Sequence, residues 1–306
     1  MKQSYSTHTA RNRTPAYANA SLTDANLVLE GGAMRGQFTA GVLDFLMDND
    51  IWCANVYGTS AGALNGYNYI AGEIGRTCYL NTKYCGDSRY LSMRNFALTG
   101  SAIRKDFMFD AIPNVLDPFD FEAFRNSPMK LTTVASNLET GEADYHIMQE
   151  AQSNWELSYL QASASMPLVS KIIEVDGKKL LDGGPCDSVP LLYAMLARTS
   201  EKHIVVLTQD ETYVKGPNKT MPLVRRVYAD YPLFIERMEH RHFEYNRTYR
   251  WIERLHNEGK AFIIRPPEPV TISNMEKDPE KLFALYEQGY AEAARHYEEL
   301  IAYLGK

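Results

Sequence analysis

Asn26-Leu-Val-Leu-Glu-Gly-Gly-Ala-Met-Arg-Gly36 and Gly58-Thr-Ser-Ala-Gly62 bound the stretch that decides the fold. Residues 27–29 form a short apolar run that two glycines stop, which is typical of a buried strand. After Gly36, apolar residues recur at the spacing of one helix face. A second short strand at residues 55–57 enters the second glycine-rich turn, and a helix follows at residues 63–71. Residues 26–66 therefore predict two successive strand–turn–helix units.

The second turn has the pattern G-x-S-x-G, with Ser60 between Gly58 and Gly62. In a nucleophile elbow, the serine lies in a strained strand-to-helix turn, and the flanking glycines avoid Cβ atoms that would clash there. Ser60 would then lie at a helix N-terminus, where backbone N–H groups and the helix dipole favour a negatively charged oxygen. The pattern predicts a nucleophilic serine.

The first turn is a candidate for an oxyanion hole. Successive glycines let backbone amides converge on one point, and an arginine in the turn adds charge or anchors the loop. Either turn alone is a weak signal, but the two together favour a serine hydrolase. The residues assigned to the oxyanion hole are Gly31, Gly32, Ala33, Met34, Arg35 and Gly36.

A serine hydroxyl needs a base to act as a nucleophile at neutral pH. In the usual triad this base is a histidine, and the chain has 7 histidines. None of them has the setting of Asp182, which ends a predicted strand and is followed by Gly183 and Gly184. A Ser60–Asp182 dyad is therefore the better hypothesis, and His146 is the histidine alternative.

The strand–turn–helix pattern continues along the chain. β-rich runs at residues 129–136, 143–148, 203–208 and 261–265 predict further strands. Residues 171–181 predict a hairpin, because two such runs flank an Asp-Gly pair, which is typical of a type I′ turn. Helices are expected at residues 189–197, with Asp187 or Ser188 as the cap, and at residues 279–304. This alternation implies a mainly parallel sheet that is covered on both faces.

Two segments allow more than one interpretation. Residues 72–128 are rich in aromatics without a strict period, so they form either a wall for an acyl chain or core packing beneath a long connection. Residues 225–257 interleave arginines with aromatic residues. This helical run could contact anionic lipid headgroups, although its own glutamates at helical spacing favour a solvated surface.

The composition excludes several classes of protein. The 306 residues, 45% hydrophobic and 23% charged, suit a soluble globular protein of one large domain or two. The net charge of −6 argues against binding of nucleic acid through bulk charge. No apolar run approaches the ~18 residues that a membrane span needs. The 4 cysteines lack a C-x-x-C pair, so we expect free thiols rather than a zinc site or a disulfide framework.

The first 23 residues contain no acidic residue and no apolar signal segment, so we expect a disordered arm and, by default, a cytoplasmic location.

The motifs Gly31–Gly36, Gly58–Gly62 and Asp182–Gly184, in this order, resemble those of the patatin-like phospholipases, in particular bacterial members with a Leu-Glu-Gly-Gly opening. The segment 163–167 also fits, and the resemblance covers residues 26–209. It implies a three-layer α/β/α fold with a mainly parallel central sheet. We expect a disordered arm at 1–24, a catalytic domain at 25–214, and a mainly helical extension at 215–306 that packs on that domain.

The resemblance also implies acyl-ester hydrolysis by a serine–aspartate dyad. Ser60 would be the nucleophile and Asp182 the general base, with the oxyanion stabilised by amides of Gly32, Ala33 and Met34. The substrate would be a lipid or another acyl ester, with contact to a membrane surface as a further option. No metal or organic cofactor is required. Four glycines would support the elbow and the aspartate loop: Gly58, Gly62, Gly183 and Gly184.

One departure from the family concerns Ala33, because the family commonly has a third glycine there. If this position needs φ > 0, alanine costs ~1 kcal/mol or more and could turn an amide away from the hole. A catalytically weak module that binds lipid or protein is therefore the alternative function. A nucleotide-binding loop is a poorer explanation, since the turn matches neither G-x-G-x-x-G nor G-x-x-x-x-G-K-[ST]. A normal aspartate is a weak base, so we also expect partial desolvation of Asp182.

Overall fold

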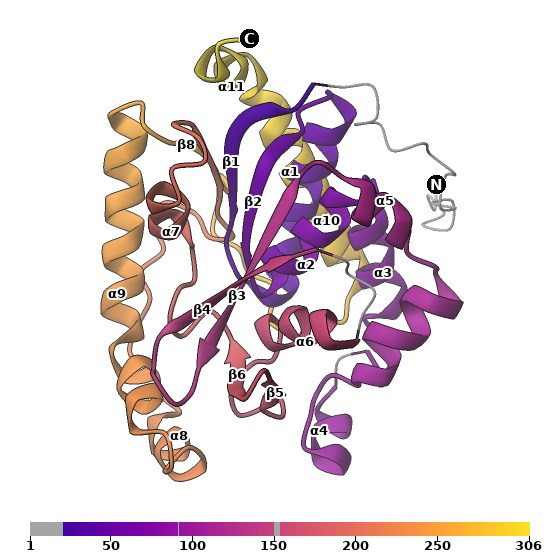
Figure 1. The fold of residues 1–306 in the computed structure, drawn as a ribbon, viewed down its shortest axis with the longest axis vertical. Coiled ribbons are helices and arrows are strands. Elements are labelled where there is room, and N and C mark those ends of the chain that lie inside the picture. Colours follow the sequence, from indigo (N-terminus) through magenta and orange to yellow (C-terminus); the bar gives the residue numbers. More distant parts are fainter. Residues whose placement is uncertain (1–20, 91, 150–153) are drawn as a thin grey trace.

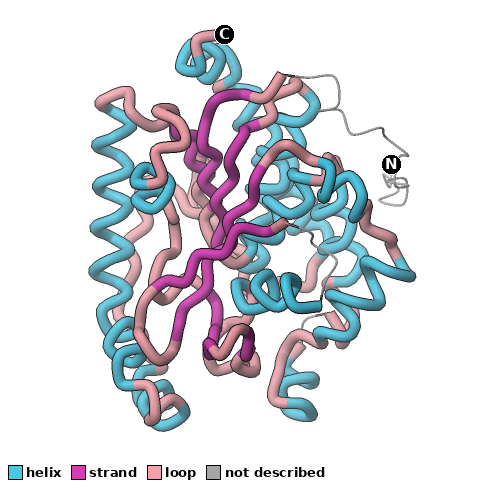
Figure 2. The backbone as a smooth tube through the Cα atoms, viewed as in Figure 1, coloured by secondary structure: helices cyan, strands magenta, loops and turns pink. Residues whose placement is uncertain are grey.

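A mixed sheet runs through the centre of the computed structural model, which describes residues 21–90, 92–149 and 154–306 (Figures 1 and 2). Within these residues the sheet has eight strands in the order β5-β6-β3-β2-β1-β7-β8, and β4 also pairs with β3. Neighbours from β8 to β3 are parallel, whereas β4, β6 and β5 join antiparallel. The predicted mainly parallel sheet is confirmed. The strands are β1 Thr23–Leu29, β2 Cys53–Thr59, β3 Lys130–Asn137, β4 Ala143–Met148, β5 Ile173–Val175, β6 Lys178–Asp182, β7 His203–Val206 and β8 Phe262–Ile264.

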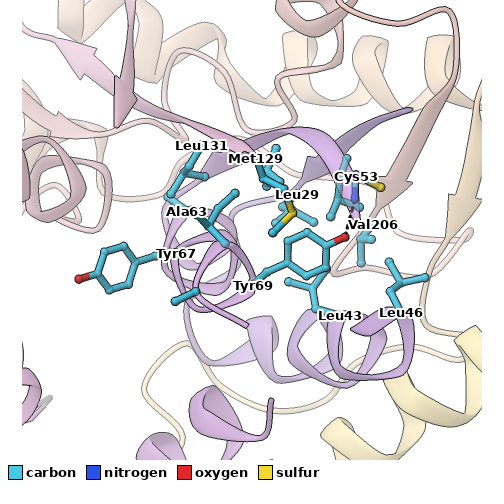
Figure 3. Packing of buried hydrophobic residues seen from close by; sticks show 14 of the residues in the cluster. Leu29, Leu43, Leu46, Cys53, Ala63, Tyr67, Tyr69, Met129, Leu131 and Val206 are labelled. Carbon is cyan, nitrogen blue, oxygen red and sulfur yellow. Dashed lines mark hydrogen bonds between the residues drawn. The ribbon is translucent and has the colours of Figure 1, made fainter. Parts of the chain in front are cut away.

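Helices cover both faces of the sheet and make three layers (Figure 1). Successive residues of β1 point to opposite faces: Leu27 and Leu29 belong to one core, and Val28 belongs to the other. The first core packs on α1 (Gly36–Asp48), α2 (Ala61–Ile70), α6 (Asn154–Ser163) and α10 (Pro279–Arg295); the second packs on α7 (Leu191–Leu196) and α9 (Pro232–Asn257). Figure 3 shows the first core, where Leu29, Leu131 and Val206 of the strands meet side chains of α1 and α2.

Short helices make up the long connection after α2, as predicted. They are α3 (Arg76–Tyr84), α4 (Met93–Thr99), the π-helix η3 (Asp106–Leu116) and α5 (Phe121–Asn126). The interpretation of its aromatics as core packing is confirmed, since Phe107, Phe119 and Phe124 belong to hydrophobic cores. Phe109 and Phe119 also line a cavity, and its use as a wall for an acyl chain stays a prediction. In the described residues, no helix is both long enough and apolar enough to cross a membrane.

The register of β3 brings two distant segments together. β4 pairs with β3 from Leu131 to Ser136, so it occupies one edge of that strand. β2 and β6 must therefore share the other edge, end to end. Thr59 of β2 pairs with Val134, and Asp182 of β6 pairs with the next residue, Ala135. The residue that follows Thr59 is Ser60, so the end of β2 and the end of β6 converge on one point.

The C-terminal region joins the same layers. β8 pairs with β7, and α10 packs against α1. The two helices approach closely at two glycines, because a Cβ at Gly41 would lie 2.0 Å from the carbonyl oxygen of Tyr286, and one at Gly289 would lie 2.0 Å from that of Phe38. The boundary between residues 214 and 215 stays a prediction. β1 begins at Thr23, and residues 1–20 of the predicted arm lie outside the described residues.

Two local predictions were wrong. The helix expected at 279–304 is interrupted at His296 and continues as α11 (Tyr297–Leu304). Neither Asp187 nor Ser188 caps α7, which begins at Leu191 after Pro190. Both side chains are used elsewhere, since Asp187 accepts a hydrogen bond from the Tyr145 hydroxyl (2.8 Å) and Ser188 donates to the Gly184 carbonyl (2.7 Å). The type I′ turn at Asp176-Gly177 is confirmed by positive φ angles of 52° and 71°.

Candidate active site

Ser60 lies in a strained turn between β2 and α2, with φ 55° and ψ −120°. Glycines are required around it: a Cβ at Gly62 would lie 2.4 Å from the carbonyl oxygen of Leu29, and one at Gly58 would lie 2.7 Å from the backbone of Ala63. The Ser60 amide donates to Ser163 Oγ (2.9 Å), whose hydroxyl donates to the carbonyl of Val134 (2.6 Å). The chain around Ser60 therefore has the geometry of a nucleophile elbow.

Asp182 faces Ser60 across the end of the sheet. Ser60 Oγ donates to Asp182 Oδ2 at 2.5 Å, and the Gly184 amide donates to Oδ1 at 2.8 Å. Both side chains are nearly buried, with 7% of Ser60 and 6% of Asp182 exposed. A Cβ at Gly183 would lie 2.4 Å from the Val134 carbonyl oxygen, so this loop position also requires glycine. The structure thus brings together the two residues that the sequence singled out.

The environment of Asp182 alters its proton affinity in the expected direction. Burial raises the pKa of this carboxyl group above its ordinary value, while the Ser60 hydroxyl, the Gly184 amide and the positive charge of Arg241 act to lower it. A carboxylate that is desolvated but still supported by donors is a stronger base than one in water.

The glycine-rich turn lies directly beside Ser60. A Cβ at Gly31 would lie 3.1 Å from that of Ser60. The Gly31 amide donates to the Ser188 carbonyl (3.1 Å), and the Arg35 amide donates to that of Gly32 (3.1 Å). The Gly36 amide is likewise used within the short 3₁₀ helix η2 (Ala33–Arg35). Among the described residues, three amides of the turn have no acceptor, those of Gly32, Ala33 and Met34. These are the amides that the resemblance to the patatin-like phospholipases assigned to the oxyanion.

Ala33 has φ 49°, in the left-handed region that favours glycine. The backbone strain that we expected for an alanine at this position of the glycine-rich turn is therefore present. The side chain of Arg35 anchors the turn, because Nη1 donates to Asn274 Oδ1.

Glu30 is a site residue that the sequence did not single out. Only 1% of it is exposed, and its carboxylate accepts hydrogen bonds from the Thr208 amide (2.6 Å) and from the hydroxyls of Tyr249 (2.6 Å) and Tyr245. Both tyrosines belong to α9, so this carboxylate ties the start of the glycine-rich turn to the C-terminal region. In the sequence, Glu30 could have been noticed as a single charged residue between an apolar strand and two glycines.

Two cavities meet at Ser60. One is mostly apolar and extends between α2 and the long connection, where Leu64, Leu80, Phe109, Ile112, Phe119 and Leu160 line it. The other, which we call the polar cavity, has a mixed lining that includes charged side chains, and it lies between the glycine-rich turn, the Asp182 loop and α9. Ala33 and Met166 line both cavities together with Ser60. A molecule at this site could place an apolar part in one cavity and a polar part in the other.

His146, the alternative base, lines neither of these cavities. Its ring stacks on Tyr159 at 3.7 Å, and Nε2 lies 3.6 Å from Glu156 Oε1. Of the described histidines, His242 on α9 is the one on the cavity walls.

The sequence profile of the patatin-like phospholipase family matches residues 27–195, more than half of the chain. The chain belongs to the patatin-like phospholipase family. Residues 231–305 of this patatin-like chain also match a domain of unknown function, DUF6363. Ser60, Asp182 and the glycine-rich turn all lie within the patatin-like region.

Several proteins are similar to this patatin-like chain. The uncharacterized protein YjjU of Escherichia coli is 26% identical over 259 residues, which cover 80% of this chain and 69% of that protein. An uncharacterized NTE family protein of Mycobacterium tuberculosis is 26% identical over 166 residues, 54% of this chain and 44% of the relative, so the match spans less than half of the mycobacterial protein. Among solved structures, VipD from Legionella pneumophila matches 92% of this chain and 68% of its own, with 12% identity and a TM-score of 0.46.

Proposed function

We propose that this protein is a serine acyl hydrolase that cleaves the carboxylic ester of a lipid, as a phospholipase A, a lysophospholipase or a lipid esterase. The observation that carries the proposal is the 2.5 Å contact between Ser60 Oγ and Asp182 Oδ2 at the point where an apolar and a polar cavity meet. A lipid ester has its reactive carbonyl at such a junction, between an acyl chain and a polar headgroup.

The reaction would proceed in two steps. Asp182 takes the hydroxyl proton as Ser60 Oγ bonds to the ester carbonyl carbon, and the carbonyl oxygen becomes an oxyanion. The free amides of Gly32, Ala33 and Met34 would stabilise that charge. When the carbon–oxygen bond to the alcohol breaks, Asp182 returns the proton to the leaving alcohol. Water then attacks the acyl-enzyme, gives a proton to Asp182, and releases the fatty acid as the proton returns to Ser60.

Exposed apolar side chains on η3 and α4 support contact with a lipid surface. The helix η3 lines that cavity through Met108, Phe109 and Ile112, while Val115 at its end is 73% exposed. In α4, Leu98 is also 73% exposed. A cytoplasmic protein that contacts membranes peripherally would dock these side chains first.

The strain at Ala33 favours the alternative function, a catalytically weak module that binds a lipid or a protein through the same cavities. This alternative keeps the fold and the cavities but predicts little turnover. The two functions differ in whether Ser60 can be acylated.

Labelling with a serine-reactive phosphonate tests the proposal. We expect mass spectrometry to find one adduct on Ser60 in the wild type and none in Ser60→Ala. Ser165→Ala is the matched control, because Ser165 is also buried but its hydroxyl donates to the Gln161 carbonyl (2.7 Å). Labelling that persists in Ser60→Ala would refute the assignment of the nucleophile. Absence of labelling and of ester turnover in the wild type would favour the binding module.

The base is tested by separate substitutions. Asp182→Asn should abolish hydrolysis of a soluble ester, whereas His146→Gln and His242→Gln should retain it. Loss of hydrolysis in either histidine variant, with retention in Asp182→Asn, would assign the base to histidine.

A further inference from the structure

Four cationic side chains line the polar cavity beside Ser60. Three of them are half-buried: Arg35 from the glycine-rich turn, Lys215 from the loop before α8 (Met221–Val227), and Arg241 from α9; the fourth, Lys219, is exposed. In the described part of the chain, none of the three forms a salt bridge with a carboxylate. A cavity with several positive charges and no paired acidic group attracts an anion.

Two N–H donors of these cationic side chains have no hydrogen-bond partner among the described residues. Arg35 Nε and Arg241 Nε are both buried, and neither has a hydrogen-bond acceptor among the described residues. Arg241 makes one long contact, from Nη2 to Ser188 Oγ at 3.4 Å. A buried N–H group without an acceptor costs free energy.

Lys215 is held in place from two sides. Asn246 of α9 accepts from its backbone amide (2.9 Å) and donates to its carbonyl (3.0 Å), and the ammonium lies 4.2 Å from the ring centroid of Tyr245. A lysine that is positioned in this way loses little conformational entropy when it binds a ligand.

The acidic groups around the cluster are already engaged. Asp182 accepts from Ser60 and Gly184, and Glu30 accepts from Thr208 and two tyrosines. Burial, with the positive charges of Arg241 and Arg35, lowers the pKa of Lys215 to about 8, although Glu30 acts to raise it. The three cations line the same cavity.

We propose that Lys215, Arg241 and Arg35 form the subsite for a phosphate-bearing headgroup, so that the enzyme prefers acyl esters that carry a phosphate over neutral esters with the same acyl chain. This inference rests on the proposed function, since it places the headgroup next to the scissile ester. Lys215 and Arg241 lie outside the patatin-like region of residues 27–195. The C-terminal region therefore supplies two of the three cations that select the headgroup, while the patatin-like region supplies Arg35 and performs the chemistry.

The test compares a monoacylglycerol phosphate with the monoacylglycerol of the same chain, both below the concentration at which they aggregate. At pH 7 we expect kcat/KM for the monoacylglycerol phosphate to be at least roughly tenfold higher than for the monoacylglycerol, because a hydrogen bond to a charged partner contributes about that much. Lys215→Met and Arg241→Gln should each reduce that ratio about tenfold. Lys215→Arg should retain it, and so should Arg250→Gln, which removes an exposed charge from the same helix. A wild-type ratio near one, or a ratio unchanged in both loss-of-charge variants, would overturn the proposal.

A binding experiment separates this inference from the proposed hydrolysis. Calorimetry on Ser60→Ala, alone and combined with Lys215→Met, measures affinity for the monoacylglycerol phosphate and for inorganic phosphate. We expect the lipid phosphate to bind more tightly than inorganic phosphate and to lose affinity about tenfold with Lys215→Met. If the wild type hydrolyses both substrates equally well, the headgroup preference is refuted but the proposed hydrolase is not. If it hydrolyses neither substrate, the proposed hydrolase is refuted, and the calorimetry still decides whether the subsite binds the lipid phosphate. If inorganic phosphate bound as tightly as the monoacylglycerol phosphate, the assignment of the subsite to a headgroup would be overturned.

Discussion

At the scale of single residues, Ala33 combines a place in the proposed oxyanion hole with backbone strain. Its φ of 49° costs an alanine roughly 1–2 kcal/mol. Glycine would remove that cost but would lose roughly 0.5–1 kcal/mol to the greater freedom of the unfolded chain. Because relief of strain is the larger effect, Ala33→Gly should raise the free energy of unfolding by up to about 1 kcal/mol. Urea denaturation at equilibrium measures this change.

Ala40→Gly is the matched control for Ala33→Gly. Ala40 lies inside α1, where glycine should destabilise the protein by about 1 kcal/mol. The two alanine-to-glycine changes should therefore have opposite signs. If both variants had a lower free energy of unfolding than the wild type, glycine at position 33 would not relieve strain in the turn.

A second prediction at the scale of single residues concerns Arg241 and the pH dependence of kcat/KM. Its charge acts to lower the pKa of Asp182, which burial raises. A general base works only when ionised, so kcat/KM on a neutral ester should fall as the pH drops through the pKa of Asp182. Without the positive charge the carboxyl group holds its proton to a higher pH, and Arg241→Gln should move this acid limb upward. A pH–rate profile that coincides with those of the wild type and of Arg250→Gln would contradict the expectation.

At the scale of elements, the two glycine-rich turns and the strand before Asp182 could be predicted from sequence, because their signals are local. Apolar runs, paired glycines and an Asp-Gly turn are all read within a few residues. The meeting of Ser60 with Asp182 depends on the shared edge of β3, which is a non-local pairing. No periodicity encodes it, and it was indicated only by the glycine-flanked setting of Asp182 and by the resemblance in motif order.

Besides Glu30, two residues near the site that the sequence did not reveal, Lys215 and Arg241, come from the C-terminal region. Lys215 and Arg241 reach the cavity because α9 packs across the face of the sheet. On the sequence, Arg241 is one of many arginines that alternate with glutamates, so nothing distinguishes it from a solvated residue. The break at His296 also lacked a signal, since neither glycine nor proline marks it.

The contact between α1 and α10 depends on two glycines. A Cβ at Gly289 would lie 2.0 Å from the Phe38 carbonyl oxygen, and a backbone atom inside a helix cannot move away independently. Gly289→Ala should therefore push the helices apart and lower the free energy of unfolding by about 3 kcal/mol. Gly86→Ala is the control, because a Cβ there would meet nothing within 4 Å. Equal stability of the two variants in urea would show that the helices do not cross so closely.

At the scale of the whole molecule, the patatin-like region and the C-terminal region share their cores. The C-terminal region supplies the edge strand β8, the helix α10 against α1, and the tyrosines of α9 that donate to Glu30. In the described residues, both faces of the sheet are thus covered partly from residues beyond 214. The extension that the sequence predicted to pack on a catalytic domain contributes to the layers of that domain.

A chain that ends at residue 214 should consequently fail to fold. It would expose Val28, Val205 and Ile204 on the two faces of the sheet, leave β7 as an unpaired edge, and leave Glu30 buried without its tyrosine donors. We expect no cooperative transition in near-ultraviolet circular dichroism during urea denaturation. The control is the full chain cleaved at a protease site placed after Gly216, where the backbone is exposed and a Cβ would contact nothing. The cleaved protein keeps every packing contact and should unfold in one transition. A truncated chain that unfolds cooperatively would instead establish an independent domain that ends near residue 214.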